Sequence, residues 1–123
     1  MPLEISNIQI EDDRIEISCA GPVSGEGLKE LIDKVKSILI NKKPAIQNIL
    51  VDLTGIEGKL NFMEHFNIGQ DIANKLIDYK LAVVTKPIVV NKVAENVATK
   101  KGARMLMTYD RQKALKWFIE NKK

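Results

Sequence analysis

The spacing of apolar and polar positions divides the chain into strand-like and helix-like segments. Apolar and polar residues alternate in part over residues 3–10 and again over residues 14–20, where Ile15, Ile17 and Cys19 share one face. The acidic run 11–13 separates the two segments. Alternation on both sides of a polar turn predicts an antiparallel β-hairpin that is covered on one face only or lies at the edge of a sheet.

Helical spacing of apolar residues begins after this hairpin and returns three more times. The first helix is predicted over residues 28–39, with Ser24 as its N-cap. A second is predicted from Phe62 to Tyr79, because Asn61 and Glu64 have the spacing of a capping box. A third should run from within residues 87–91 to residue 101, and a fourth should follow residue 110.

The second predicted helix carries the most specific expectations about its faces. Gly69 lies near its middle, where glycine costs about 1 kcal/mol relative to alanine. Either a close approach to a neighbouring backbone or ligand explains it, or the glycine is merely tolerated. The apolar residues expected to point inward are Phe62, Phe66, Ile72, Ala73, Leu76 and Ile77.

Three short apolar runs separate the predicted helices. They cover residues 46–53, 81–84 and 105–107, and continuous apolar runs of this length are typical of buried parallel strands. The resulting order is β-β-α-β-α-β-α-β-α. It predicts an α/β fold with a mixed, mainly parallel sheet that begins with the hairpin, and right-handed crossovers. We expect one domain covering residues 1–123.

Composition narrows the class of protein. The 123 residues are 45% hydrophobic, yet no apolar stretch reaches the roughly 20 residues that span a membrane. The first residues lack a basic region followed by an apolar one, so we expect a cytoplasmic protein. Cys19 is the single cysteine; no internal disulfide can form, and its interpretation is a small buried hydrophobe.

Charge is unevenly distributed and suggests partners only in general terms. Residues 1–61 contain 7 Lys and Arg against 10 Asp and Glu, whereas residues 62–123 contain 12 against 6. A basic second half could attract an acidic partner, a phosphate or a membrane surface, although lysines also simply solvate helix faces. Aromatic residues are few and no basic cluster is interleaved with them, which argues against nucleic-acid binding.

The candidate site follows the buried run Ile49–Gly55, which is predicted to stop at a polar turn. In open α/β sheets, ligands are usually met beyond the carboxyl ends of strands. We therefore expect a partner-binding or ligand-binding surface after the third strand. Its residues are Asp52, Thr54, Gly55, Glu57, Gly58, Lys59, Asn61 and His65. The neighbouring turns near Gly21 and Thr85 are expected to complete this surface.

Three of these residues also suggest chemistry. Asp52 is expected mainly to order the turn by accepting backbone N–H bonds, and secondarily to hold a cation or a ligand hydroxyl. Thr54 is expected to bond the local backbone, although its hydroxyl could be phosphorylated. His65, the sole histidine, is expected at the surface or in a capping role. An enzyme using Asp52 and His65 as an acid–base pair is the least favoured alternative, because two groups without further partners do not specify a reaction.

The sequence lacks the motifs of nucleotide-binding and zinc-binding proteins. There is neither a G-x-x-x-x-G-K-[ST] nor a G-x-G-x-x-G pattern, so no nucleotide site is predicted. One histidine and one cysteine cannot build a multi-histidine zinc site, and no cofactor is expected. The remaining alternative is a carrier of a small apolar ligand or lipid, with Phe66, Ile72 and Met105 lining its pocket.

Several segments together resemble a known family. The run Ile49–Ile56, the strand Leu81–Val84, and the ending from Gly102 to Asp110 followed by Ala114–Phe118 are similar to the STAS domain and the SpoIIAA-like group, which is related to the CRAL-TRIO domains. The resemblance covers nearly the whole chain.

This resemblance implies a function and removes one mechanism. STAS domains are usually non-catalytic regulatory modules that bind a partner protein, and they often pair, so a homodimer is left open. The sporulation branch carries a phosphorylated serine at the start of the second helix. The matching residues here, 58–63, contain no hydroxyl, so that switch is not carried over.

Overall fold

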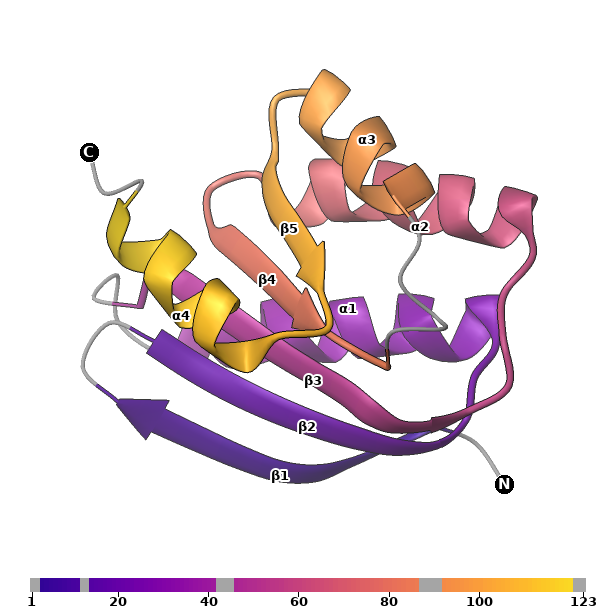
Figure 1. The fold of residues 1–123 in the computed structure, drawn as a ribbon, viewed down its shortest axis with the longest axis horizontal. Helices are drawn as coiled ribbons and strands as arrows, with labels where there is room; N and C mark the ends of the chain where they lie inside the picture. The colour runs from indigo at the N-terminus through magenta and orange to yellow at the C-terminus, as the bar shows by residue number, and fades with distance from the viewer. Residues whose placement is uncertain (1–2, 12–13, 42–45, 87–91, 121–123) are drawn as a thin grey trace.

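A computed structural model describes residues 3–11, 14–41, 46–86 and 92–120 of the chain. Five strands form one mixed sheet in the order β1-β2-β3-β4-β5, so each strand lies beside its neighbours in the sequence (Figure 1). The strands are β1 (Glu4–Glu11), β2 (Arg14–Pro22), β3 (Asn48–Glu57), β4 (Lys80–Val84) and β5 (Arg104–Thr108). The helices are α1 (Gly25–Asn41), α2 (Phe62–Lys75), α3 (Lys92–Lys100) and α4 (Arg111–Glu120). The predicted order and fold class are confirmed.

The N-terminal hairpin pairs β1 and β2 antiparallel, and all later neighbours in the sheet are parallel. Strand β1 forms one edge of the sheet and is largely exposed, whereas Ile15, Ile17 and Cys19 of β2 are buried as predicted. Burial raises the pKa of the Cys19 thiol to about 11, so this cysteine behaves as a hydrophobic residue. The predicted turn at residues 12–13 lies outside the described residues.

Helices α1, α2 and α3 cover one face of the sheet, and α4 covers the other (Figure 1). Alternation along β3 and β4 produces this division. Leu50, Ala82 and Val84 pack with Ala114 and Phe118 under α4. Residues one position away along these strands, such as Val51, Leu81 and Val83, belong to the larger core beneath the other three helices.

The crossing of α2 and α3 explains the glycine inside a helix. A Cβ atom added to Gly69 would lie 2.6 Å from the carbonyl oxygen of Ala94 and 2.9 Å from Cβ of Val97. These distances leave no room for a side chain, so glycine permits the two helix backbones to approach each other. Of the two explanations for Gly69, the close approach is correct.

Helix α2 differs from its prediction at its end and in its inward face. It ends at Lys75 instead of Tyr79, because Leu76 leaves helical geometry and the chain turns there into β4. Phe62 and Ile77, predicted inward, are 61% and 42% exposed. Ile72, Ala73 and Leu76 are buried as predicted, but the stripe also includes His65, Ile68 and Gly69.

Two buried charged residues of the sheet, Lys80 and Glu16, bind α4 at its two ends. Nζ of Lys80, on β4, donates to the carbonyl oxygens of Trp117 and Phe118 at 3.1 and 3.0 Å, and lies 4.7 Å from the centre of the Trp117 ring. It thereby supplies donors to the C-terminal end of the helix. At the N-terminal end, Arg111 contacts Glu16 of β2 at 2.6 Å.

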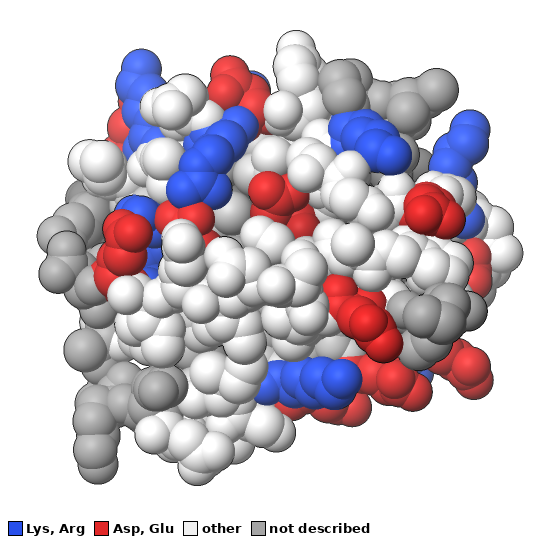
Figure 2. Space-filling view, turned by 90° about the horizontal axis from the view of Figure 1, so that it is seen from below, with Lys and Arg blue, Asp and Glu red and all other residues white. Residues whose placement is uncertain are grey.

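The outer surface of the hairpin is weakly charged in its middle. Figure 2, which looks at the molecule from the side of β1, shows a central area free of Lys, Arg, Asp and Glu with charged side chains around it. Ile8 and Ile10 of β1 are 43% and 44% exposed.

Among the described residues, no helix has the length and apolar character required to cross a membrane.

Candidate functional site

Strand β3 continues past the point where the sequence predicted a turn. Asp52 pairs with Ser18 of β2, and the next pair is Gly55 with Ala20, so two residues of β3 stand opposite one of β2. This β-bulge lets the strand run on to Glu57. The prediction that the strand stops at residues 53–55 is therefore wrong: the polar residues there mark a bulge, and the true turn begins at Gly58.

Asp52 stabilises the bulge. Its Oδ1 accepts hydrogen bonds from the backbone N–H of Thr54 at 2.9 Å and from the Thr54 hydroxyl at 2.7 Å. The predicted structural role of Asp52, ordering the backbone that follows it, is borne out by these bonds. The Thr54 hydroxyl was expected to bond the local backbone, but it donates to the Asp52 carboxylate instead.

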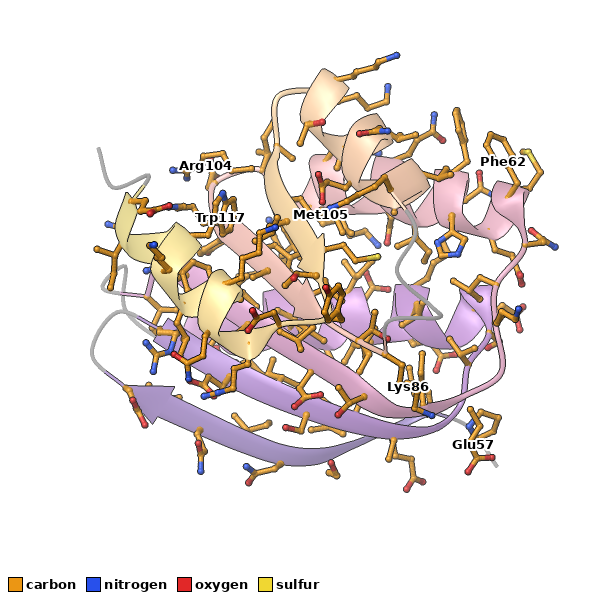
Figure 3. The ribbon with its side chains drawn as sticks, viewed as in Figure 1. Glu57, Phe62, Lys86, Arg104, Met105 and Trp117 are labelled. Carbon is orange, nitrogen blue, oxygen red and sulfur yellow. The ribbon has the colours of Figure 1, made fainter. Side chains whose placement is uncertain are left out.

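Beyond Asp52, β3 has lost its pairing with β4 and is paired only with β2. Thr54, Gly55 and Glu57 are exposed along this two-stranded extension. Nζ of Lys86, just after β4, donates to the carbonyl oxygen of Ile56 at 3.0 Å and links the extension to the rest of the sheet. Figure 3 shows Glu57 and Lys86 at the same end of the molecule.

The turn and the start of α2 are held by a capping box, as predicted. Asn61 accepts from the N–H of Glu64 at 2.8 Å, and the Glu64 carboxylate accepts from the N–H of Asn61 at 2.9 Å. The other carboxylate oxygen of Glu64 receives a longer bond, 3.4 Å, from the N–H of Gly25 at the start of α1. Gly58, with φ of +91°, allows the turn to reverse before the helix. Glu64 thus ties the beginnings of two helices together.

An apolar cavity of about 80 Å³ lies beneath this segment, between the sheet and helices α1, α2 and α3. Ile72 and Met105, proposed from the sequence as pocket residues, line it, whereas Phe66 does not. The lining residues are Val23, Leu28, Leu31, Ile32, Val35, Val51, Leu53, Ile56, Lys59, Leu60, His65, Ile68, Ile72, Leu76, Leu81, Val83, Thr85, Ala94, Met105 and Met107. Figure 3 shows Met105 on β5, on the inner side of the molecule, and Phe62 on the outer side of α2.

Three polar side chains interrupt this apolar lining. Thr85, just after β4, is 2% exposed, and its hydroxyl has no hydrogen-bond partner among the described residues. His65 is 7% exposed. Lys59 is exposed and is the single cationic residue of the lining.

The burial of His65 corrects the expectation of a surface or capping histidine. Helix α2 begins at Phe62, and the inward stripe passes through His65, Ile68 and Ile72, so the imidazole faces the core. Burial lowers the pKa of His65, and the adjacent Glu64 carboxylate opposes this effect only in part. The imidazole is therefore neutral at pH 7.

The structure separates Asp52 from His65. Val51 and Leu53 line the cavity, and Asp52 between them does not. Because successive side chains of a strand point to opposite faces, Asp52 is directed away from the face on which His65 lies. The two groups are not brought together as an acid–base pair. Over the described residues, no group of three or more His, Cys, Asp and Glu side chains could hold a metal ion.

Sequence reasoning placed the turn near Thr85 beside the binding surface, but it did not assign the Thr85 side chain to the cavity. Leu81, Val83 and Thr85 recur at every second position, and all three line the cavity. This period-two pattern was the available signal, because it places a hydroxyl on the same face as two core residues.

Comparisons of the sequence and of the fold give different results. No family model matches the sequence, and no curated protein matches it closely enough to count as a relative. Solved structures do match. An uncharacterized protein of the DUF3478 family with a SpoIIAA-like fold, from Shewanella loihica PV-4, superposes with a TM-score of 0.53 at 21% identity, covering 94% of this chain and 93% of that one.

Two anti-sigma factor antagonists match in the same way. One, from Mycobacterium paratuberculosis, has a TM-score of 0.61 at 13% identity and covers 94% of this chain and 92% of that one. The other, SpoIIAA in its unphosphorylated form, has a TM-score of 0.54 at 10% identity and covers 98% and 99%. These similarities extend over nearly the whole of each chain and concern the fold. The protein therefore has the SpoIIAA-like fold, which includes the anti-sigma factor antagonists.

Proposed function

We propose that this protein is a non-catalytic binding module of the SpoIIAA-like fold that takes up a small apolar ligand beneath the segment following β3. One observation carries the proposal: Lys59 and Leu60, from the turn predicted to bind, line the same cavity as core residues of the sheet and helices. The turn thus covers an apolar space large enough for a guest, and it combines two expectations from the sequence, a binding segment and an apolar pocket.

The chemistry of the lining supports binding more than catalysis. Its side chains are almost all aliphatic or thioether groups, which favour an apolar guest through burial of surface. Asp52 is engaged with Thr54, and Glu64 is engaged with backbone N–H groups. Neither carboxylate is among the lining residues, so neither is positioned to act on a guest in the cavity.

The test is a titration of the protein with five-carbon probes, followed by NMR of its isoleucine, leucine and valine methyl groups. Binding in the cavity should shift methyl signals of Val51, Leu81 and Ile72. A Val83→Phe variant should abolish these shifts by filling the space, whereas the control Ile10→Phe, on the exposed edge strand, should retain them. If no probe shifts the cavity methyls of the wild-type protein, the proposed function is wrong.

A protein partner is the second candidate, favoured by a separate observation. Phe62 and Met63 are 61% and 57% exposed in the first turn of α2, which the capping box holds in place. Adjacent exposed apolar residues of this kind often mark an interaction site. The partner surface would combine them with Glu57 and Lys59 of the preceding segment.

Substitution tests the partner surface. Replacing Glu57 and Lys59 by alanine should weaken a partner complex isolated by affinity capture and identified by mass spectrometry, without changing the unfolding temperature. Unchanged capture of that partner by the double variant would remove this surface from consideration. Thr54 and Gly55 stay predicted contributors to the same surface, and a homodimer stays a prediction for size measurements in solution.

A further inference from the structure

We propose that the ligand of the cavity is a small apolar molecule bearing one uncharged oxygen group, a hydroxyl or a carbonyl, which hydrogen-bonds to the Thr85 hydroxyl. The inference rests on the proposed function, because it names the class of ligand for the same cavity.

The first argument is the state of the Thr85 side chain. Thr85 is 2% exposed, and its Oγ1 is buried with no hydrogen-bond partner among the described residues. Its backbone N–H, in contrast, donates to the carbonyl oxygen of Thr108 at 3.0 Å, so the main chain at this position is held by the sheet. Buried hydroxyls are nearly always hydrogen-bonded in native proteins. An unpartnered one on the face of an apolar cavity is suited to a polar atom of a guest.

The second argument is His65, the other buried polar side chain of the lining. Its imidazole lines the cavity, and burial lowers its pKa. A neutral imidazole offers one N–H donor and one acceptor nitrogen. It can accept from a hydroxyl or donate to a carbonyl, and it adds no charge to the cavity.

The third argument concerns the charge of the ligand. An ionised carboxylate moved into this lining would lose its hydration, and Thr85 and a neutral His65 would not compensate for its charge. Lys59 is the one cation among the lining residues, and its exposed side chain remains solvated. A purely apolar molecule would leave the Thr85 hydroxyl unpaired. An uncharged oxygen on a short apolar body satisfies both requirements.

The volume limits the size of that body. The cavity of about 80 Å³ is roughly half of a ~150 Å³ cavity that holds benzene. A body of about three carbon atoms fits inside. The rest of a five-carbon chain extends past Lys59 and Leu60 at the turn, with its oxygen group inside the cavity.

The experiment compares three five-carbon probes that differ in one group: 1-pentanol, 1-chloropentane and pentanoate. Dissociation constants come from the methyl shifts of the cavity residues at pH 7. We expect 1-pentanol to bind roughly three- to tenfold more tightly than 1-chloropentane, which is the range for one net hydrogen bond. Pentanoate should bind most weakly.

Substitutions assign the effect to one hydroxyl. Thr85→Val, which keeps the shape and removes the hydroxyl, should reduce the preference for 1-pentanol to nearly onefold while 1-chloropentane binds as before. Thr85→Ser should keep the preference, and it tests the hydroxyl independently if the valine variant folds poorly. Thr108→Val, at a buried threonine outside the lining, is the matched control and should bind like the wild type.

The outcomes separate this inference from the proposed function. Equal binding of 1-pentanol and 1-chloropentane to the wild type, or an unchanged preference in Thr85→Val, overturns the assigned ligand class and leaves the apolar cavity as a binding site. Tightest binding by pentanoate overturns the uncharged class. Failure of all three probes to shift the cavity methyls overturns both the inference and the proposed function.

Discussion

The same substitution, threonine to valine, should have opposite effects on stability at two buried positions. Thr85 and Thr108 are 2% and 6% exposed and lie on neighbouring segments of the sheet. The Thr108 hydroxyl accepts a hydrogen bond from the N–H of Asp110 at 3.1 Å, whereas the Thr85 hydroxyl has no partner among the described residues. The two sites thus differ in whether their hydroxyl is satisfied.

The magnitudes follow from this difference. A buried polar group without a partner destabilises the folded state by about 1–3 kcal/mol, so Thr85→Val should raise the free energy of unfolding by about 1–2 kcal/mol. Thr108→Val removes a satisfied bond and should lower it by about 0.5–1.5 kcal/mol. For a chain of 123 residues, 1 kcal/mol corresponds to roughly 4 °C in the unfolding temperature.

Urea unfolding of the ligand-free protein, followed by Trp117 fluorescence and by circular dichroism, measures both values. Trp117 lies on α4, on the opposite side of the sheet from the cavity, so its signal reports unfolding without local disturbance. A Thr85→Val protein that is less stable than the wild type would refute the reasoning, because the hydroxyl would then have a partner that stabilises the fold.

Three further predictions concern α2. Gly69→Ala should lower the free energy of unfolding by about 1–2 kcal/mol, because the contact with Ala94 outweighs the gain of helix propensity; Asn67→Ala on the exposed face is the control, and a stabilised Gly69→Ala protein would contradict the crossing geometry. Asn61→Ala should cost about 1 kcal/mol through loss of the cap, measured by thermal unfolding, and no loss would mean that the capping box is not formed. The pKa of His65 is lower in the folded state than its ordinary value of 6.5, so the stability that the neutral imidazole contributes is complete above pH 6.5 and is lost as the pH falls toward the folded pKa. Between pH 7 and 5.5, the free energy of unfolding of His65→Gln should fall less than that of the wild type. Equal losses would show that His65 does not cause the pH dependence.

The order of elements could be predicted because each is encoded by local patterns. Ser24 and Asn61 mark helix starts, and the Ser24 hydroxyl accepts from the N–H of Gly27 as an N-cap should. Gly102, with φ of +99°, ends α3 as expected of a C′ glycine. These signals act over a few residues and are therefore visible in the sequence alone.

The errors arose where distant segments decide the outcome. The run from Asp52 to Gly55 has the composition of a turn, yet pairing with β2 extends it as a strand through a bulge. His65 was expected at the surface because histidine is polar, yet the position at which α2 begins places its side chain inward. Neither the partner strand nor the rotation of a helix can be derived from the residues at these positions.

Only part of the candidate site could be predicted, because distant segments also decide where the cavity forms. The segment at residues 59–60 was correctly placed near the carboxyl ends of the strands, and it lines the cavity. The cavity itself is a volume left between α1, α2, α3 and three strands, and its size depends on how all of them pack. Asp52 orders the backbone at Thr54, as expected, and does not line the cavity.

The sequential strand order has a consequence for how the chain acquires its structure. Each strand adds to an edge formed by the strand immediately before it, so the sheet can grow in the direction of synthesis with short loop closures. The pair between Arg111 and Glu16 is an exception, since 95 positions separate its residues. It can form only after α4 has emerged. We therefore expect docking of α4 to be the last folding step, and a ribosome-bound chain ending before residue 111 to possess the sheet without this closing contact.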